Sequence, residues 1–263
     1  MEEYVTLTGR NDWESQLAFT DHSSFFYPSV GLSAVLTEMI KLPEFISYAK
    51  IRGSYTSVAS SFDRFLSNPG FEFLEQSHQW STSSTRPAVN LKPERTKSWE
   101  IGLNTKFWND LSFDFTFYKS NTYNQTFQIS QSSASGFSTA VVQSGNVQNY
   151  GIEMGIGYRH KFGDVEWNSN FTFTMNRNKI KELMEGAKDP ETGELIADEE
   201  RRVATLGAAG YAPVIILRKD GGMGDIYVEK HLATDGNGNI KVDSQTGKVS
   251  IAEYPEPRKV GSL

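Results

Sequence analysis

The residue types that most often do chemistry are present in this chain, but their spacing does not build a recognisable catalytic set. The 263 residues include four histidines and no cysteine, which excludes thiol nucleophiles, disulfides and cysteine metal ligands within them. No His-x-x-x-His or Gly-x-Ser-x-Gly spacing occurs, and no phosphate-binding loop. We therefore expect neither an enzyme nor a cofactor binder. A hydrolase would need a Ser or an Asp beside one of the histidines in space, which are His22, His78, His160 and His231.

The strongest hint of a metal site is Asp235–Asn239, where side-chain oxygens stand at alternate positions and Asp243 follows four residues later. This spacing resembles the first half of a calcium-binding loop. The sixth position is Ile240, where such a loop needs glycine, and the closing glutamate is absent. We therefore expect no metal here and favour a Gly/Asn-rich hairpin turn between Val228 and Val242.

Aromatic residues in the predicted loops are the candidates for substrate contact. Exposed rings stack on sugar rings or peptide side chains, and binding residues concentrate on loops. For each ring the alternative is packing of the loops on each other or on a partner protein. The candidates are Phe62, Phe65, Phe71, Phe73 and Trp80 in the loop Ser61–Pro93, and Tyr123, Phe127 and Phe137 in or beside the loop Thr126–Asn146.

The elements that position these residues are β-strands, because apolar and polar residues alternate along four stretches in the middle of the chain. One face of each stretch is almost wholly apolar, and the other carries Ser, Thr, Asn, Gly and charged residues. The polar positions Glu100, Lys106, Glu153 and Arg159 are expected to face an inner surface, against either water or a plug. The four stretches are Ser98–Phe107, Leu111–Tyr118, Tyr150–Arg159 and Val165–Asn176.

Weaker strand patterns precede these four, and the connections between strands alternate in length. The earlier strands are Glu3–Gly9, Phe25–Thr37 and Ile46–Ser60, which makes seven in all. A two-residue turn at Asn109-Asp110 and a three-residue turn at Phe162–Asp164 join the last four strands in pairs. The long connections include Arg10–Ser24, Ser61–Pro93 and Thr126–Asn146. An up-and-down sheet with long loops at one end and tight turns at the other is typical of outer-membrane barrels.

Strand length and aromatic placement support the same fold. The last four strands have about the 9 to 11 residues that a tilted membrane strand needs. Aromatic residues gather at the tight-turn end, as in an interfacial girdle. We therefore predict an all-β, antiparallel, up-and-down transmembrane β-barrel with long extracellular loops. Because alternation shows only that two faces differ, a soluble β-sandwich that binds carbohydrate is the alternative. The girdle residues are Phe107, Trp108, Tyr158, Phe162 and Trp167.

Composition narrows the class of protein further. The formal net charge is −6, which argues against a nucleic-acid binder because such a protein needs a basic face. The longest apolar run, Ala212–Leu217, is far shorter than a membrane-spanning helix requires. The stretch Met1–Tyr4 has neither the basic nor the apolar region of a signal peptide.

The stretch Leu91–Leu103, LKPERTKSWEIGL, resembles a motif of the barrel in SusC/RagA-type TonB-dependent transporters, commonly LKPE-x-T-x-S-W-E-x-G. Three more stretches look similar to the same family and follow in the family's order and spacing. The resemblance covers most of residues 1–180, and the remainder is similar to a long extracellular segment of these transporters. The additional stretches are Tyr27–Val30, Tyr118–Gln125 and Gly145–Glu153.

The resemblance implies a location, a function and partners. Such transporters import oligosaccharides or peptides across the outer membrane of Bacteroidetes-type bacteria. A SusD-like surface lipoprotein closes the barrel as a lid, and TonB supplies energy through an N-terminal plug domain. The family's barrel has 22 strands, whereas the sequence predicts seven and contains no plug. We therefore expect a fragment of a larger barrel; an adhesin-type barrel without transport is a further alternative.

Two regions are expected along the chain. Residues 1–181 hold the barrel strands and their loops, and residues 182–263 form a long extracellular loop region with short hairpins. In the second region the charge-rich stretch Glu194–Arg202 is expected to form a short solvated helix, with contact to the lid lipoprotein as the alternative.

Overall fold

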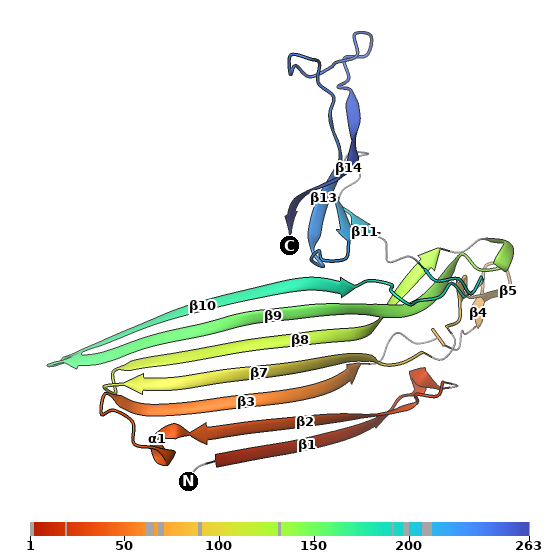
Figure 1. Ribbon diagram of the computed structural model, residues 1–263. Coiled ribbons are helices and arrows are strands. Elements are labelled where there is room, and N and C mark those ends of the chain that lie inside the picture. The colour runs from red at the N-terminus through yellow and green to blue at the C-terminus, as the bar shows by residue number, and fades with distance from the viewer. Residues whose placement is uncertain are drawn as a thin grey trace.

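The computed structural model describes residues 3–18, 20–60, 66–67, 71–88, 91–130, 133–190, 192–196, 200–206 and 212–262. Its main sheet runs in the order β1-β2-β3-β7-β8-β9-β10, and every neighbouring pair is antiparallel (Figure 1). The strands are β1 (Glu3–Trp13), β2 (Ser24–Val35), β3 (Ile46–Ser60), β7 (Glu94–Phe107), β8 (Leu111–Ser130), β9 (Thr139–Phe162) and β10 (Val165–Glu182). This confirms the prediction of seven consecutive antiparallel strands.

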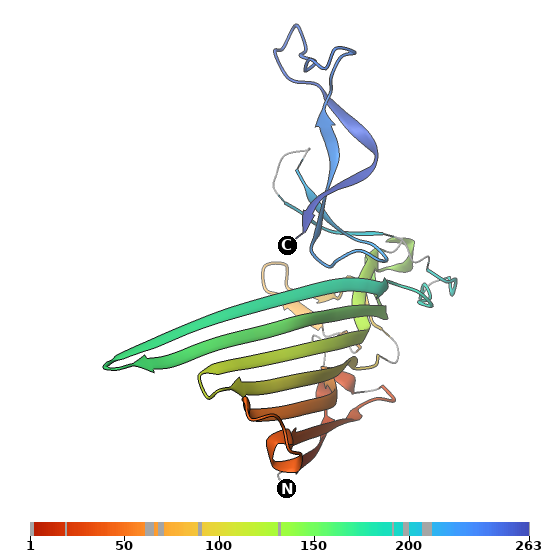
Figure 2. The same cartoon turned by 60° about the vertical axis from the view of Figure 1, so that its left-hand side comes forward.

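The smaller elements lie mainly between or beyond the ends of these strands. The pair β4 (Phe71–Leu74) and β5 (Gln79–Thr82) forms a separate hairpin, and β6 (Thr85–Arg86) pairs in parallel with β9. A second sheet stands beyond the end of β10, in the order β11-β12-β13-β14 (Figure 2). The remaining bounds are β11 (Arg201–Thr205), β12 (Val214–Leu217), β13 (Asp225–Leu232), β14 (Ile251–Ser262), α1 (Leu36–Met39), η1 (Ser15–Leu17) and η2 (Ser133–Ser135).

The predicted loop Thr126–Asn146 is wrong, because most of it is strand. After Tyr123 pairs with Asn146, the next pair is Gln125 with Ser144. Between these pairs lie Asn124 and Gly145, with φ of 59° and 93°. Residues that tolerate the left-handed region can interrupt a ladder without ending it. The hairpin of β8 and β9 therefore continues beyond this irregularity, where the alternation of the sequence is lost.

Other predicted bounds also need correction. Strand β1 continues to Trp13, which shortens the predicted loop Arg10–Ser24, and the predicted strand Phe25–Thr37 ends at Val35, where α1 follows. The ladder places three residues in the turn between Phe107 and Leu111. Only two residues lie in the turn between Phe162 and Val165. The sequence predicts two residues in the first turn and three in the second, so the observed lengths are the reverse of the predicted ones.

The predicted helix at Glu194–Arg202 is wrong for the residues that the structure describes. Leu195 forms an isolated bridge with Lys188, and β11 begins at Arg201 and pairs with β12. Residues 197–199 lie outside the described part. Pairing with a neighbouring strand overrides the helical preference of a charged stretch, since local propensity is weak compared with tertiary context.

The main sheet is a single layer over most of its length, and the buried clusters gather at its loop end. One cluster contains Leu17, Phe25 and Leu91, and another contains Ile180 and Leu183. Along the strands, large apolar side chains such as Ile101 and Phe171 stay exposed. A sandwich would bury this face under a second sheet, so the sandwich alternative does not fit. Among the described residues, no helix is long and apolar enough to cross a membrane.

Candidate functional site

The hydrogen-bond register divides the main sheet into a polar face and an apolar face. The apolar face is clearest in one row of residues that lie opposite one another on successive strands: Val5, Leu32, Gly53, Ile101, Phe117, Ile152 and Met175. The neighbouring positions point the other way, because successive side chains of a strand alternate between faces. The residues predicted to line an inner surface all lie on this polar face: Glu100, Lys106, Glu153 and Arg159.

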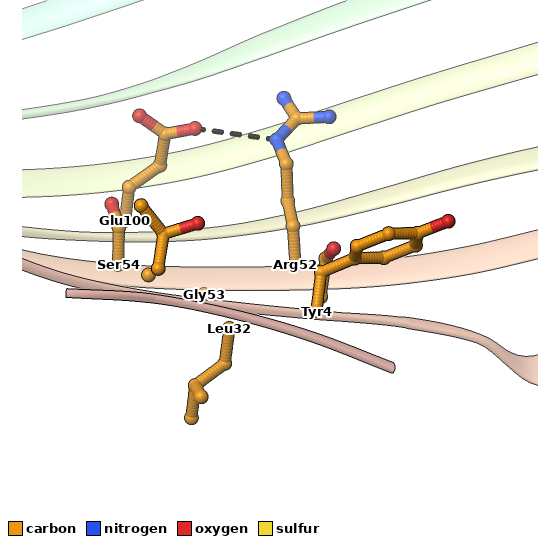
Figure 3. Close-up of a pocket in the computed structure, with 9 residues that line it drawn as sticks. Tyr4, Leu32, Arg52, Gly53, Ser54 and Glu100 are labelled. Carbon is orange, nitrogen blue, oxygen red and sulfur yellow. Dashed lines mark hydrogen bonds and ion pairs between the residues drawn. The ribbon is translucent and has the colours of Figure 1, made fainter. Parts of the chain in front are cut away.

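The centre of the polar face is organised by Arg52 on β3. Its Nη1 donates to Asn104 Oδ1 at 2.7 Å, and its Nη2 donates to Thr116 Oγ1 at 2.6 Å. Its Nε lies 3.4 Å from Glu100 Oε1 (Figure 3), and its Nη1 lies 3.6 Å from Asp114 Oδ2. One guanidinium therefore connects β3 with both β7 and β8, as its planar fork of donors allows.

Gly102 makes this reach possible. The register places Arg52 opposite Gly102, and Gly102 opposite Thr116. A Cβ atom at position 102 would lie 2.6 Å from Arg52 Cζ and 2.8 Å from Arg52 Cγ. Only glycine lets the arginine side chain cross β7 to reach β8.

The space beside this network is small. A cavity of about 190 Å³ lies between the arginine network and the first two strands (Figure 3). Ligand pockets usually measure about 300–1,000 Å³, so this cavity suits water or a small group rather than an oligosaccharide or a peptide. Its polar lining comes from Tyr4, Thr6, Ser33, Arg52, Ser54 and Glu100.

The other predicted polar residues are more open to solvent. Arg159 forms an ion pair with Glu166 across the β9–β10 hairpin, and both side chains are largely exposed. Lys106 and Glu153 are also exposed. The sequence reasoning missed Arg52, although its position in the polar alternation of β3 (Lys50, Arg52, Ser54 and Thr56) could have indicated it.

Three of the candidate aromatic residues form one exposed surface on the β4–β5 hairpin. Phe73 lies opposite Trp80 with 5.3 Å between the ring centroids, and Phe71 occupies the same face two residues earlier. Phe71 and Trp80 are 71% and 68% exposed. The exposure of these rings leaves them able to stack on a ligand or a partner. Phe62 and Phe65 lie outside the described residues.

The candidates on β8 and beyond it have different surroundings. Phe127 packs against the buried cluster around Ile180 and Leu183, as the packing alternative expects. Tyr123 lies opposite Arg95, and its ring faces Lys97 Nζ at 5.6 Å. Phe137 is half-buried two residues after the end of η2. The structure does not bring these three together with the aromatic surface of the β4–β5 hairpin in one site.

One histidine does have the aspartate partner that the hydrolase alternative required. His160 Nδ1 lies 2.7 Å from Asp110 Oδ2, at the tight-turn end of β9. The ring also contacts Phe162, with 4.5 Å between centroids. No hydroxyl group of a described residue hydrogen-bonds to His160, so the pair lacks a nucleophile.

The stretch at Asp235 forms a turn. Asp235 Oδ1 accepts hydrogen bonds from the backbone N–H of Asn237 and Asn239, each at 2.9 Å. Bridges from Thr234 to Ile240 and from Val242 to Val249 extend the tip of the β13–β14 hairpin. Over the described residues, no cluster of three or more His, Asp or Glu side chains could hold a metal ion. The hydrogen bonds of Asp235 and these two bridges make the stretch the tip of a hairpin, as the hairpin interpretation expects.

A two-faced antiparallel sheet with tight turns at one end and elaborated connections at the other defines a section of an outer-membrane β-barrel wall. The family model described as "TonB dependent receptor-like, beta-barrel" matches residues 4–246. The chain belongs to this family, whose barrels lie in the outer membrane. The result confirms the predicted fold class and location.

Individual relatives are longer than this chain and match it over different extents. The TonB-dependent receptor P3 of Formosa agariphila is 32% identical over 99 residues, which are 37% of this chain and 10% of that protein. The RagAB peptide transporter has the same fold, with a TM-score of 0.67 and 17% identity over 97% of this chain and 28% of that chain. The closed-closed RagAB peptide importer has a TM-score of 0.63 and 16% identity, covering 98% of this chain and 28% of that chain.

These findings agree with the SusC/RagA-type resemblance of the sequence motifs. The chain spans about a tenth of the curated relative and less than a third of each RagAB chain.

Proposed function

We propose that this chain is a section of the wall of an outer-membrane importer that takes up oligosaccharides or peptides. The single observation that carries the proposal is the separation of the two faces along the strands between the tight turns and the row that contains Ile101 and Phe117. An apolar face suits lipid, and a polar face with charged side chains suits a water-filled or plugged lumen. Glu100, Lys106, Glu153 and Arg159 would line that lumen.

The Arg52 network supports this assignment of the inner surface. Arg52 offsets part of the negative charge of Glu100 and Asp114 and links β3, β7 and β8, so the centre of this face stays polar. Glu153 and Lys106 stay exposed and would contact either the solute or a plug domain. Substrate contact would come from the aromatic surface of the β4–β5 hairpin at the loop end.

The family and the SusC/RagA-type resemblance support two partners for this proposal. Energy would come from TonB through a plug domain outside this segment, and a SusD-like lipoprotein would close the loop end. The RagAB proteins are described as a peptide importer, and this chain is similar to them in fold. We therefore include peptides beside oligosaccharides as substrate classes.

The test is uptake by the full-length transporter that contains this segment. A strain in which its gene is deleted and then restored would be supplied with defined oligosaccharides or peptides as sole nutrient. Growth that depends on the gene and on TonB is expected for one substrate class. Growth on all these nutrients without the gene would contradict the proposal. Affinity purification of the transporter in mild detergent should also recover the lipoprotein.

A further inference from the structure

The apolar face changes character at one row of residues toward the loop end. The register places Tyr55 opposite Trp99, Trp99 opposite Lys119, and Lys119 opposite Tyr150; Tyr150 in turn lies opposite Arg177. We call these five residues the interface row. The adjacent row toward the tight turns, which contains Ile101, Phe117 and Ile152, is wholly apolar. Cationic side chains thus begin where the apolar band ends.

The position of the interface row fits the upper boundary of a membrane. Eight residues separate Phe107 at the tight-turn end of β7 from Trp99, about 27 Å along a strand at roughly 3.4 Å per residue. A strand tilt of about 40° reduces this to about 20 Å along the membrane normal, close to the height of about 25 Å of the apolar band in such barrels. Because the long loops of these barrels are extracellular, the interface row lies at the outer leaflet.

The aromatic members of the row suit that level. Tyr55 and Trp99 are exposed, and Tyr150 is half-buried. Tyr and Trp side chains concentrate at the boundary between hydrocarbon and headgroups, where one end of the ring is apolar and the other is wet. They place Lys119 and Arg177 at the depth of the headgroups.

The two cations of the row have no counter-ion in the described part of the chain. Neither Lys119 nor Arg177 forms an ion pair with a described carboxylate, whereas Arg52 and Arg159 on the polar face both do. Along β7 to β10 as far as Ile180, all the carboxylates at paired positions lie on the polar face; Glu182 pairs with Asn146 beyond a register shift at the loop end of β10. The carboxylates on the polar face are Glu94, Glu100, Asp114, Glu153 and Glu166.

Further cations extend the positive charge beyond the row. Lys97 is exposed on the same face, two residues above Trp99. Lys179 follows Arg177 on that face, but Asp220 Oδ1 lies 2.8 Å from its Nζ. Lys97, Lys119 and Arg177 thus carry positive charge without a described carboxylate partner, across β7, β8 and β10, and Arg95 on the same face hydrogen-bonds, among the described residues, only to Phe26 O.

We propose that Lys97, Lys119 and Arg177, set among the aromatic rings of the interface row, form a binding site for the phosphate groups of an anionic glycolipid of the outer leaflet. Arginine and lysine form charge-assisted hydrogen bonds to phosphate. The apolar row below accepts the acyl chains, and the rings pack against the sugar part of the headgroup. The lipid supplies the negative charge that the chain does not.

The test uses the full-length transporter in nanodiscs and purified lipopolysaccharide as the probe. The double variant Lys119→Gln/Arg177→Gln should bind lipopolysaccharide about 25-fold more weakly than the unmodified protein, since each cation near an anionic surface contributes about a fivefold factor. The matched control is Lys106→Gln, which removes one positive charge from the opposite face of the sheet. It should leave the affinity unchanged.

Three results would overturn the proposal: unchanged affinity in the double variant, an equal loss in Lys106→Gln, or equal binding of zwitterionic phosphatidylethanolamine. The charge-preserving variant Lys119→Arg/Arg177→Lys covers the case in which the first variant does not assemble. It should retain at least a third of the affinity, and a loss as large as 25-fold would also contradict the proposal. Nutrient uptake is measured separately, so failure of the importer function would leave this test intact.

Discussion

Arg52 shows how one side chain can set the structure of the wall. It joins three strands through Asn104, Thr116 and Glu100, and the small Gly102 lets it pass. Sequence alternation correctly predicts that these residues lie on the polar side. It does not predict that they meet, because contact depends on the register of strands far apart in the sequence.

Replacement of Arg52 by glutamine should weaken the barrel. The variant leaves Glu100 and Asp114 without their cation and removes a hydrogen bond to the buried Thr116. Hydrogen bonds to charged groups contribute about 1.5–3 kcal/mol each, and partial exposure of the network reduces this. We expect the free energy of unfolding of the full-length barrel in lipid vesicles to fall by about 1–3 kcal/mol in urea.

The control for this experiment is Arg159→Gln. Arg159 also forms an ion pair, with Glu166, but both of these side chains are well exposed. Exposed ion pairs contribute little, so this change should stay within about 0.5 kcal/mol. Equal effects of the two substitutions would contradict the role of Arg52.

Asp225 should make the second sheet sensitive to acid. Burial by itself raises the pKa of Asp225, but hydrogen bonds from Lys259 Nζ at 2.6 Å and Gly222 N–H at 3.0 Å outweigh burial and hold the pKa below its usual range. The pKa is therefore lower in the folded than in the unfolded chain, where it is about 3.9. The stabilisation is complete well above pH 4 and is lost as the pH falls through the folded pKa.

Hydrogen exchange of β13 and β14, corrected for the intrinsic effect of pH, measures this dependence. At pH 7 the Asp225→Asn variant should exchange faster than the unmodified protein by a factor that corresponds to about 1–3 kcal/mol. The difference should shrink below pH 4. The same difference at both pH values would refute the assignment to Asp225.

At the scale of elements, regular strands were the easiest part to predict from sequence. The alternation in Leu111–Tyr118 and Val165–Asn176 fixes both the strand and its two faces, because a slip of one residue would exchange the faces. The predictions from sequence failed where a backbone irregularity or pairing with another strand decides the local structure. The irregularity at Asn124 and Gly145 hides the continuation of β8 and β9, and strand pairing from Arg201 onward replaces the end of the expected helix.

An introduced charge should lower the stability of the barrel by different amounts at two neighbouring positions of β10. Phe173 lies on the apolar face opposite Met154, whereas Thr174 lies on the polar face opposite Glu153. An arginine on the lipid side near the bilayer midplane costs about 2–4 kcal/mol. Phe173→Arg should therefore lower the free energy of unfolding in vesicles by that amount, and Thr174→Arg should lower it by less than about 1 kcal/mol. Equal losses would mean that the two faces do not have different surroundings.

The aromatic surface of the β4–β5 hairpin should affect uptake more than folding. The double variant Phe73→Ala/Trp80→Ala removes both aromatic rings. Their stacking on a bound solute would contribute about 0.5–1.5 kcal/mol. The concentration for half-maximal uptake should rise about 2- to 10-fold. Leu74 is exposed and lies on the opposite face of the same hairpin, so Leu74→Ala is the control. An unchanged value in the double variant would assign these rings to packing.

At the scale of the whole molecule, the sheet is a section of barrel wall, and we propose that its apolar face meets lipid and its polar face a lumen. Seven strands and their order followed from the sequence, as did the family resemblance that the match to residues 4–246 supports. The site could be predicted only as two sets, polar residues on strands and aromatic residues on loops. Which members meet depends on the register and on the folding of long connections, and the sequence pattern contains neither.

The central claim is that the apolar face contacts lipid and the polar face does not. Because this segment contains no cysteine, single cysteines can be placed along β8 in the full-length transporter, in a background without other cysteines. Each would carry a fluorophore in vesicles with brominated acyl chains. We expect strong quenching at Phe113, Phe115 and Phe117 and weak quenching at Ser112, Asp114 and Tyr118. Uniform or inverted quenching along the strand would contradict the account.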